Sequence, residues 1–329
     1  MGLTDAAVEA VLAIDAGNSK TDVCVVSAEG DLLARARGGS FRPHRIGAGP
    51  ALAEITPAVE AALAAAGNVR VAHAAACLAN VDFPAEEQAL EAAIAGLGWA
   101  TSYEVLNDTY ALLRAGLDEA RGVAVVCGAG INCTGVLPDG TTVRFAAVGH
   151  ISGDWGGGDH LWVEAMWWAA RAEDGRGPDT ALRTALPQYF GLASMAALIE
   201  AVHVGGIPEE RHRDLGRVLF EIADAGDPIA ADVVRRQAEE VVTLAATAIH
   251  RLGAVEEPID VVLGGGVLTA GHALLMDAIT SGLAEQAPKA AVRVVAEPPI
   301  LGAALLGLDR IGAPRAAQDR LRAAFAPVG

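Results

Sequence analysis

A strand-turn-strand pattern occurs twice in this chain, and each copy has glycine at its turn. In the first copy the apolar run 11–15 enters a turn at 16–20 and returns as 21–27. In the second copy the run 123–127 enters a turn at 128–132 and returns as 133–137. Glycine lets a turn approach an anion closely, and successive turn N–H groups form a concavity for phosphate oxygens. The duplication indicates two turns that grip one phosphate chain, although a tight hairpin needs glycine whatever it binds.

The order of these motifs resembles the actin-like ATPase superfamily of sugar kinases, heat-shock chaperones and actin. Within it, the chain resembles the BadF/BadG/BcrA/BcrD ATPase family, which includes N-acetylglucosamine kinases. Segment 15–21, Asp-Ala-Gly-Asn-Ser-Lys-Thr, is similar to the family's first phosphate motif, Asp-Gly-Gly-Gly-Thr-Lys-Thr. Segment 128–132, Gly-Ala-Gly-Ile-Asn, is similar to the second, Gly-Thr-Gly-Ser-Asn. The similarity continues through Asn107-Asp108, Gly153-Asp154, 261–267 and 299–305, so it covers nearly the whole chain.

This resemblance implies an α/β fold of two actin-like, ribonuclease H-like domains. Each domain would carry a mixed five-stranded sheet flanked by helices, with a nucleotide cleft between the two domains. Strand and helix patterns do alternate after each hairpin, as in a mixed sheet with crossover helices. A chain of 329 residues also exceeds what one core usually supports. We place the domains at 1–116 and 117–298, and the resemblance implies that the helical segment 299–329 packs back on the first domain.

Composition excludes several classes of function. The net charge of −17 and the lack of a basic patch with interleaved aromatic residues argue against nucleic-acid binding. No apolar run approaches the ~20 residues of a membrane span, and the acidic N-terminus is unlike a signal peptide. We therefore expect a cytoplasmic protein. The four cysteines form no Cys-x-x-Cys pair, which indicates reduced core residues and argues against a structural zinc site.

The resemblance implies ATP as the nucleotide, held at three glycine-bearing turns. The candidate ATP-binding residues are Gly17, Asn18, Ser19, Lys20, Thr21, Gly128, Ala129, Gly130, Asn132, Gly264, Gly265 and Gly266. The last three follow a buried strand pattern, so bare backbone could lie against the base and ribose; the alternative is a flexible strand-to-helix turn. Lys20 and Thr21 either contact the transferred phosphate or are ordinary hairpin residues. Asn18 stands where the family has glycine, and asparagine tolerates positive φ better than most residues.

Phosphoryl transfer needs in-line placement, a divalent metal and a base near the acceptor hydroxyl. Asp108 is the candidate catalytic base because it ends a buried strand pattern and precedes a helix, where such a carboxylate points into a cleft in this fold class. The alternative is that Asp108 is a helix N-cap. Asp15 ends the first strand beside the phosphate turn, where it would hold Mg²⁺ through water.

The candidate sugar-binding residues are Arg42, His44, Asn107, Asp108 and Asp154. In the family, Gly-Trp-Gly and Gly-Asp-Glu-Gly-Ser segments frame the sugar. Here the corresponding stretches are 147–149, Ala-Val-Gly, and 153–158, Gly-Asp-Trp-Gly-Gly-Gly, which keep Asp154. In the loop 39–47, Arg42 stands where the family has a sugar-contacting asparagine; an arginine facing the ligand would favour an anionic or strongly polar group. The alternatives are solvated loop side chains and a plain turn at Asp154.

Together these features predict an ATP-dependent kinase that phosphorylates a hydroxyl of an amino sugar or related hexose. Its partners would be the sugar and ATP, and a homodimer is common in this family. A second interpretation is an ATPase that activates a 2-hydroxyacyl-CoA dehydratase through an iron-sulfur cluster, for which Cys127 and Cys133 lie near a phosphate turn. A third is a sugar sensor without turnover.

Overall fold

A computed structural model describes residues 6–119 and 121–326. The chain forms two five-stranded sheets flanked by helices, which confirms the predicted α/β class. Contacts divide the chain into two compact units. Within the described residues, unit 1 comprises 6–119, 121–124, 134–148 and 295–326, and unit 2 comprises Val125–Cys133 and Gly149–Val294. The domain boundaries at 116/117 and 298/299 stay a prediction.

The first sheet has the strand order β3-β2-β1-β4-β5. Its strands are β1 Val8–Ala16, β2 Thr21–Ser27, β3 Leu32–Gly38, β4 Val69–Leu78 and β5 Ser102–Asn107. The hairpin partners β1, β2 and β3 run antiparallel, whereas β4 and β5 run parallel to β1. The sheet is therefore mixed, as the crossover pattern predicts.

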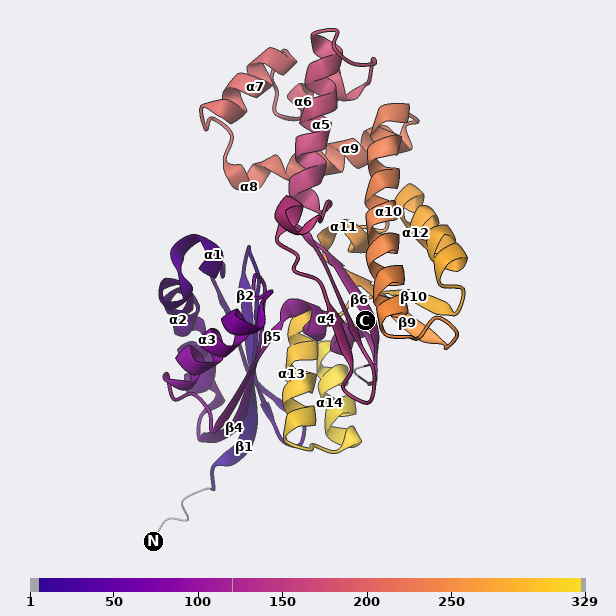
Figure 1. Ribbon diagram of the computed structural model, residues 1–329. Coiled ribbons are helices and arrows are strands. Elements are labelled where there is room, and N and C mark those ends of the chain that lie inside the picture. Colours follow the sequence, from indigo (N-terminus) through magenta and orange to yellow (C-terminus); the bar gives the residue numbers. More distant parts are fainter. Residues whose placement is uncertain (1–5, 120, 327–329) are drawn as a thin grey trace. The chain divides into compact units, whose positions relative to one another are not determined.

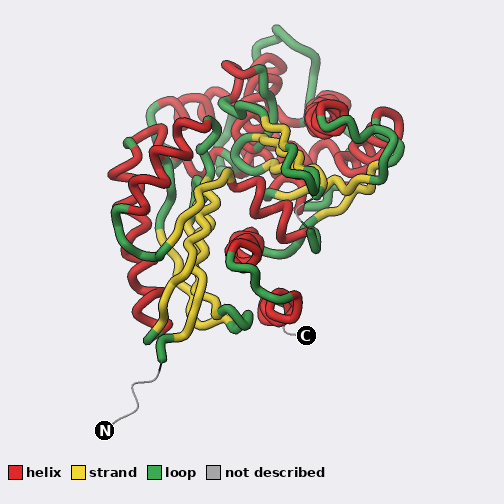
Figure 2. Tube along the Cα trace, turned by 60° about the horizontal axis from the view of Figure 1, so that its bottom comes forward, coloured by secondary structure: helices red, strands yellow, loops and turns green. Residues whose placement is uncertain are grey.

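Helices cover both faces of this sheet, as Figures 1 and 2 show. They are α1 Pro43–Ile46, α2 Ala48–Ala66, α3 Pro84–Ala95, α4 Asp108–Gly116, α13 Pro299–Arg310 and α14 Arg315–Phe325. Alternate residues of a strand point to opposite faces: Leu12 and Ile14 join the core under α2 and α3, whereas Val11 and Ala13 join the core under α13. Gly302 has no side chain, so α13 packs directly on the backbone of α4.

The second sheet has the strand order β10-β9-β6-β7-β8. Its strands are β6 Gly122–Cys127, β7 Ile131–Val136, β8 Thr142–Arg144, β9 Ile259–Gly264 and β10 Ala290–Val294. The helices of unit 2 are α5 Gly158–Glu173, α6 Leu182–Tyr189, α7 Met195–His203, α8 Glu209–His212, α9 Asp214–Asp224, α10 Pro228–Arg251, α11 Gly266–Thr269 and α12 Ala273–Gln286, with a 3₁₀ turn at Gly149–Ser152. Helices α10 and α12 lie side by side because Gly282 leaves room for Val242.

Helices α1, α6 and α8 were not anticipated from the sequence. Helix α1 lies inside the segment 39–47, which the glycine and proline content describes as a loop. Helix α6 contains Pro187, which interrupts the helical pattern, and α8 is only four residues long. The predicted helical segment 299–329 forms two helices, α13 and α14. Across the part of the chain that the structure describes, every helix is too short or too polar to cross a lipid bilayer.

Candidate functional site

The first hairpin joins β1 to β2 and ends in a tight turn in unit 1. Ala16 pairs with Thr21, and the backbone N–H of Gly17 donates to Lys20 O over 2.8 Å. The half-exposed Lys20 ammonium lies 2.8 Å from the carboxylate of Asp22. The predicted phosphate-binding residues 17–20 therefore form the turn itself, while the charge of Lys20 is paired within the same hairpin.

Side chains from two other segments hold the tip of this turn. Arg42 Nε donates to Asn18 O over 2.9 Å. Asn80, just after β4, donates from Nδ2 to Asn18 Oδ1 at 3.1 Å and to Phe41 O at 3.2 Å. Phe41 is fully buried, and its N–H donates to Gly17 O over 2.9 Å. The sequence analysis missed Asn80, although an asparagine directly after a strand and before Val81-Asp82-Phe83-Pro84 was a possible signal for a turn.

His44 lies in α1, beside the segment that braces the hairpin. Its pKa is lowered, first by burial and then by the neighbouring cations of Arg45 and Arg42. The imidazole is therefore neutral at pH 7 and can both donate and accept a hydrogen bond. Contact of His44 or Arg42 with a sugar stays a prediction.

Asp108 and Asp15 are two carboxylates of unit 1, and the charge of Asp108 acts on Asp15. Asp108 is the first residue of α4, and Asn107 is the N-cap, because Asn107 Oδ1 accepts from Thr109 N at 3.1 Å. The cap role that Asp108 could have filled is therefore taken by Asn107. Burial raises the pKa of Asp108 to about 6, although the amides of Thr109 and Asp108 itself partly offset it. Burial, then repulsion from Asp108, raises the pKa of Asp15 to about 7.

Asn107 also orients a third acidic residue, which the sequence analysis did not select. Its Nδ2 donates to Val81 O and to Asp82 Oδ1, each over 3.1 Å. Burial, followed by repulsion from Asp108 and Glu86, raises the pKa of Asp82 to about 7. The residues around Asp108 therefore form an acidic cluster, and the amide of Asn107 is committed to arranging it. Direct contact of Asn107 with substrate stays a prediction.

The second hairpin joins β6 to β7 and is held by the beginning of α5. Gly128 N donates to Gly130 O over 3.0 Å, and the N–H groups of Gly158 and Asp159 donate to Gly128 O and Ala129 O at 2.8 and 2.9 Å. The helix amides thus fix the turn through its backbone carbonyls. Asn132 is the second residue of β7, where its Oδ1 accepts from Cys133 N.

The segment 153–158 lies directly against this hairpin within unit 2. Gly157 has φ +82°, and a Cβ there would approach Ala129 O and Gly130 O to 2.5 Å. Its N–H donates to Oε1 of the fully buried Gln237 over 2.8 Å. Asp154 is also buried, and its carboxylate accepts from the hydroxyl of Ser152. The segment that carries Asp154 is therefore fixed to the second hairpin, and sugar contact by Asp154 stays a prediction.

The glycine run 264–266 joins β9 to α11. Gly265 has φ +87°, and a Cβ there would come within 2.5 Å of the backbone of Cys127. This close approach requires glycine, because the backbone of Cys127 fills the space that a side chain would occupy. Contact of residues 264–266 with adenosine stays a prediction. Burial raises the pKa of the Cys127 thiol to about 12 and that of Cys133 still further. Both thiols are fully buried, so they are unsuited to ligate an exposed cluster.

The acidic residues suit Mg²⁺ better than a metal that needs several protein ligands. Among the described residues, no group of three His, Cys, Asp or Glu side chains is placed to hold one ion. Mg²⁺ commonly binds one or two carboxylates and completes its shell with water and phosphate oxygens. Asp15 fits this requirement, because a divalent cation would offset both its burial and its repulsion by Asp108.

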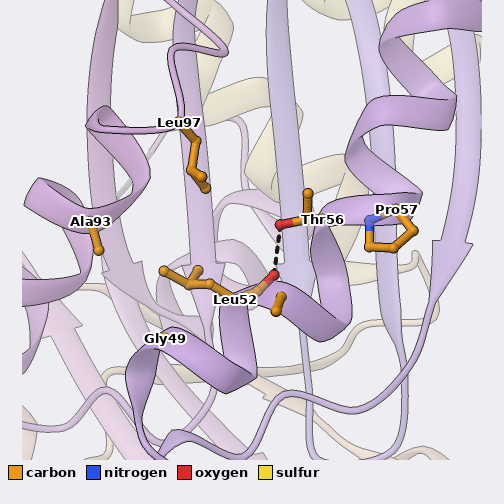
Figure 3. Close-up of a pocket in the computed structure, with 7 residues that line it drawn as sticks. Gly49, Leu52, Thr56, Pro57, Ala93 and Leu97 are labelled. Carbon is orange, nitrogen blue, oxygen red and sulfur yellow. Dashed lines mark hydrogen bonds between the residues drawn. The ribbon is translucent and has the colours of Figure 1, made fainter.

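A pocket between α2 and the end of α3 has a different chemistry (Figure 3). Its seven lining residues are Gly49, Leu52, Ala53, Thr56, Pro57, Ala93 and Leu97. The hydroxyl of Thr56 is directed into its own helix, where it donates to Leu52 O over 2.8 Å. None of these seven side chains is titratable, so we assign no chemistry to this pocket.

Comparisons with known proteins agree with the motifs. The chain is 26% identical to an N-acetyl-D-glucosamine kinase of Dictyostelium discoideum over 314 residues, 92% of this chain and 98% of that protein. It is also 26% identical to an N-acetylmuramic acid/N-acetylglucosamine kinase of Clostridium acetobutylicum over 190 residues. This second alignment covers 58% of the chain and 62% of the Clostridium protein, less than two thirds of its length.

Solved structures show the same fold. A putative N-acetylglucosamine kinase from Chromobacterium violaceum matches with a TM-score of 0.69 and 23% identity, over 91% of this chain and 99% of that one. A ROK family glucokinase from Streptomyces griseus matches with a TM-score of 0.56 and 18% identity, over 90% of this chain and 98% of that one. The model of the BadF/BadG/BcrA/BcrD ATPase family matches residues 12–307. The chain therefore belongs to the BadF/BadG/BcrA/BcrD ATPase family.

Proposed function

We propose that this protein is an ATP-dependent kinase that transfers the γ-phosphate to a hydroxyl of an amino sugar or a related hexose. The observation that carries the proposal is the state of Asp108 at the start of α4. Asn107 caps the helix, so the carboxylate of Asp108 is not needed for capping. Its pKa of about 6 leaves it mostly ionised at pH 7 and still basic enough to accept a proton.

In this mechanism Asp108 accepts the proton of the sugar hydroxyl as the hydroxyl oxygen bonds to the γ-phosphorus. The bond to the β-γ bridging oxygen breaks, ADP leaves, and the proton stays on the Asp108 carboxyl until it passes to solvent. Because phosphoryl transfer depends mostly on positioning and charge stabilisation, the protein has to hold the two reactants in line. Turns 17–20 and 128–130 would bind the phosphates, and the glycine run 264–266 would lie against adenosine.

Asp15 is the residue that would hold Mg²⁺, through one or more water molecules. Bound there, the ion would neutralise charge on the phosphate oxygens. Asp15 can hold the ion only when its carboxyl group is ionised. Because its pKa is about 7 without metal, metal binding has to displace a proton from part of the population at pH 7. Nucleotide binding should therefore weaken below pH 7.

The amino-sugar class is supported by the relatives, which are named as N-acetylglucosamine kinases. Within this chain, Asp154 could accept sugar hydroxyls from a buried position. Arg42 donates from Nε to the backbone of Asn18 and is therefore at least partly committed to the hairpin. N-acetylglucosamine is the first sugar to test. Turnover of acidic sugars would test whether the remaining Arg42 nitrogens face the ligand.

The direct test is Mg²⁺-dependent ADP release with a panel of hexoses, amino sugars, N-acetylated sugars and acidic sugars. We expect turnover that depends on one class of sugar. Steady ATP hydrolysis that is indifferent to every sugar would contradict the kinase and favour the activator ATPase, although the buried thiols of Cys127 and Cys133 oppose that role. Nucleotide and sugar binding without turnover would favour a sensor.

A homodimer is also part of the proposal, on the family resemblance alone. Light scattering of the purified protein at several concentrations would measure its mass against the 33.5 kDa of one chain. A mass that stays at this value at every concentration would contradict it.

A further inference from the structure

Asn80 has an unusual backbone conformation beside the first hairpin. Its φ is +60°, and among the described residues the only other non-glycine residue with positive φ is Ala147. This region is unfavourable for residues with a Cβ, although asparagine tolerates it better than most. Strained backbone of this kind tends to persist where the surrounding contacts offset its energy cost, often at functional sites. Contacts of Asn80 must therefore stabilise this conformation.

The side chain of Asn80 makes two hydrogen bonds to segments that are distant in sequence. Its Nδ2 donates to Asn18 Oδ1 at 3.1 Å and to Phe41 O at 3.2 Å. An amide –NH₂ has two hydrogens, so both bonds can form at once. The backbone carbonyl of Phe41 can only accept, which fixes Nδ2 as the atom of Asn80 that faces it. One amide group thus connects the hairpin tip to the segment that precedes α1.

Backbone hydrogen bonds also hold the residue before Asn80 and the partner residue Phe41. Ala79 N donates to Ala16 O over 2.8 Å, which extends the pairing of β4 with β1 up to Asn80. On the partner side, Phe41 is fully buried and donates to Gly17 O. Asn80 is therefore attached to the sheet, and its amide can transmit that rigidity to the turn.

We propose that Asn80 is a positioning residue, which holds the phosphate-binding turn 17–20 and the candidate sugar segment 41–44 in one fixed arrangement. This inference rests on the proposed function, because it assigns those two segments to ATP and sugar. Asn80 touches neither reactant and acts through Asn18 and Phe41. Without the amide of Asn80, the turn would keep its backbone hydrogen bonds, but Asn18 and Phe41 would lose their common donor. The binding of ATP or sugar would then have to order these two residues.

Two substitutions separate this role from simple support of the turn. Asn80→Gly removes both hydrogen bonds and also relieves the positive φ, so its melting temperature should stay near that of the wild type. Asn80→Asp keeps the shape but replaces the donor with an acceptor that faces two oxygens. We expect Kd for a non-hydrolysable ATP analogue to rise about tenfold in Asn80→Gly and further in Asn80→Asp, together with a fall in kcat.

The pairing with Asn18 provides a second readout. Asn18→Ala and Asn80→Gly should each raise Kd, and the double variant should be little worse than Asn80→Gly alone, because Asn80→Gly already removes the bond that Asn18→Ala removes. Thr56→Val removes one side-chain hydrogen bond from α2 in the same unit and should leave Kd and kcat unchanged. Calorimetric titration with the analogue and steady-state kinetics on the full chain give both quantities.

Wild-type Kd and kcat in Asn80→Gly and Asn80→Asp would overturn the positioning role. So would losses that follow the melting temperature alone, or fully additive effects with Asn18→Ala. If the wild type binds the analogue but phosphorylates no sugar, the proposed function fails, and the Kd values still decide the role of Asn80 at the phosphate turn. If the wild type binds no nucleotide, both proposals fail.

Discussion

The first hairpin is held mainly by side chains, whereas the second is held by backbone. Arg42 and Asn80 donate to Asn18 at the tip of the first turn. In the second, the amides at the start of α5 donate to the carbonyls of Gly128 and Ala129. The first hairpin also carries Asp15, Lys20 and Asp22, while the second turn, 128–132, has no charged residue. The two copies of the repeated hairpin are therefore stabilised by different kinds of hydrogen bond.

The two kinds of support determine how substitutions affect each hairpin. Side-chain supports can be removed one hydrogen bond at a time, each worth about 0.5–1.5 kcal/mol. Backbone supports are removed only by changing a residue that permits the close approach, such as Gly157 or Gly265. We therefore expect graded changes in binding from the first hairpin and abrupt losses of structure from the second.

The largest expected effect is that of Gly157→Ala at the second hairpin. The new Cβ would combine a strained φ of +82° with a clash against two backbone oxygens. We expect a loss of about 2–6 kcal/mol of unfolding free energy, together with loss of nucleotide binding. Chemical denaturation and calorimetry measure the two effects.

Gly175→Ala is the matched control for this change. Gly175 lies in the same unit with φ +80°, but its Cβ would meet open space. Only the backbone strain of about 1–2 kcal/mol should remain there, with binding unchanged. Equal destabilisation by the two substitutions would contradict the view that the second hairpin depends on close backbone contact.

The next effect concerns the carboxylate that the first hairpin carries. The pKa of Asp15 is about 7 in the folded protein, against an ordinary value of 3.8. The folded state therefore binds this proton more tightly, so the stability that Asp15 contributes is present below about pH 4 and is lost as the pH rises through about 7. Asp15→Asn should raise the melting temperature at pH 8 more than at pH 4, while kinase activity falls about 100-fold, as expected for a ligand of the essential metal.

Melting curves at pH 4, 6 and 8, with and without Mg²⁺ and the ATP analogue, test this prediction. The wild type should gain more from the ligands at pH 8 than Asp15→Asn does. If the variant melted like the wild type at every pH, the raised pKa of Asp15 would be contradicted. Unchanged kinase activity would instead remove Asp15 from the metal site.

Much of the fold, including both hairpins, could be predicted from the sequence, because strands and glycine turns are local features. The apolar runs on both sides of each glycine turn located both hairpins, and the strand that ends before Asn107-Asp108 was correctly placed. The partners of the turns could not be predicted. Asn80 is 62 residues from Asn18, and Gln237 is 80 residues from Gly157, so only the folded chain brings them together. Asp82 was missed because its burial and its proximity to Asp108 are likewise tertiary properties.

The smallest expected effect is that of Arg42→Ala at the first hairpin. It removes the hydrogen bond to Asn18 O, worth about 1 kcal/mol, so KM for ATP should rise ~5-fold. Lysine lacks the planar fork of arginine, and Arg42→Lys should restore little of this. A change confined to KM for the sugar would mean that Arg42 serves the ligand, and would weaken the contrast between the hairpins.

The most direct test of the account is the kinetics of Asp108→Asn with the sugar that the panel identifies. Asparagine cannot accept the hydroxyl proton, so we predict that kcat falls ~10²–10⁴-fold. The melting temperature should not fall, because Asn107 still caps α4. In the wild type at saturating Mg²⁺ and ATP, kcat/KM for the sugar should decline about tenfold per pH unit below about 6, the pKa of Asp108. An Asp108→Asn variant with undiminished sugar-dependent ADP release would contradict the assignment of this residue as the base.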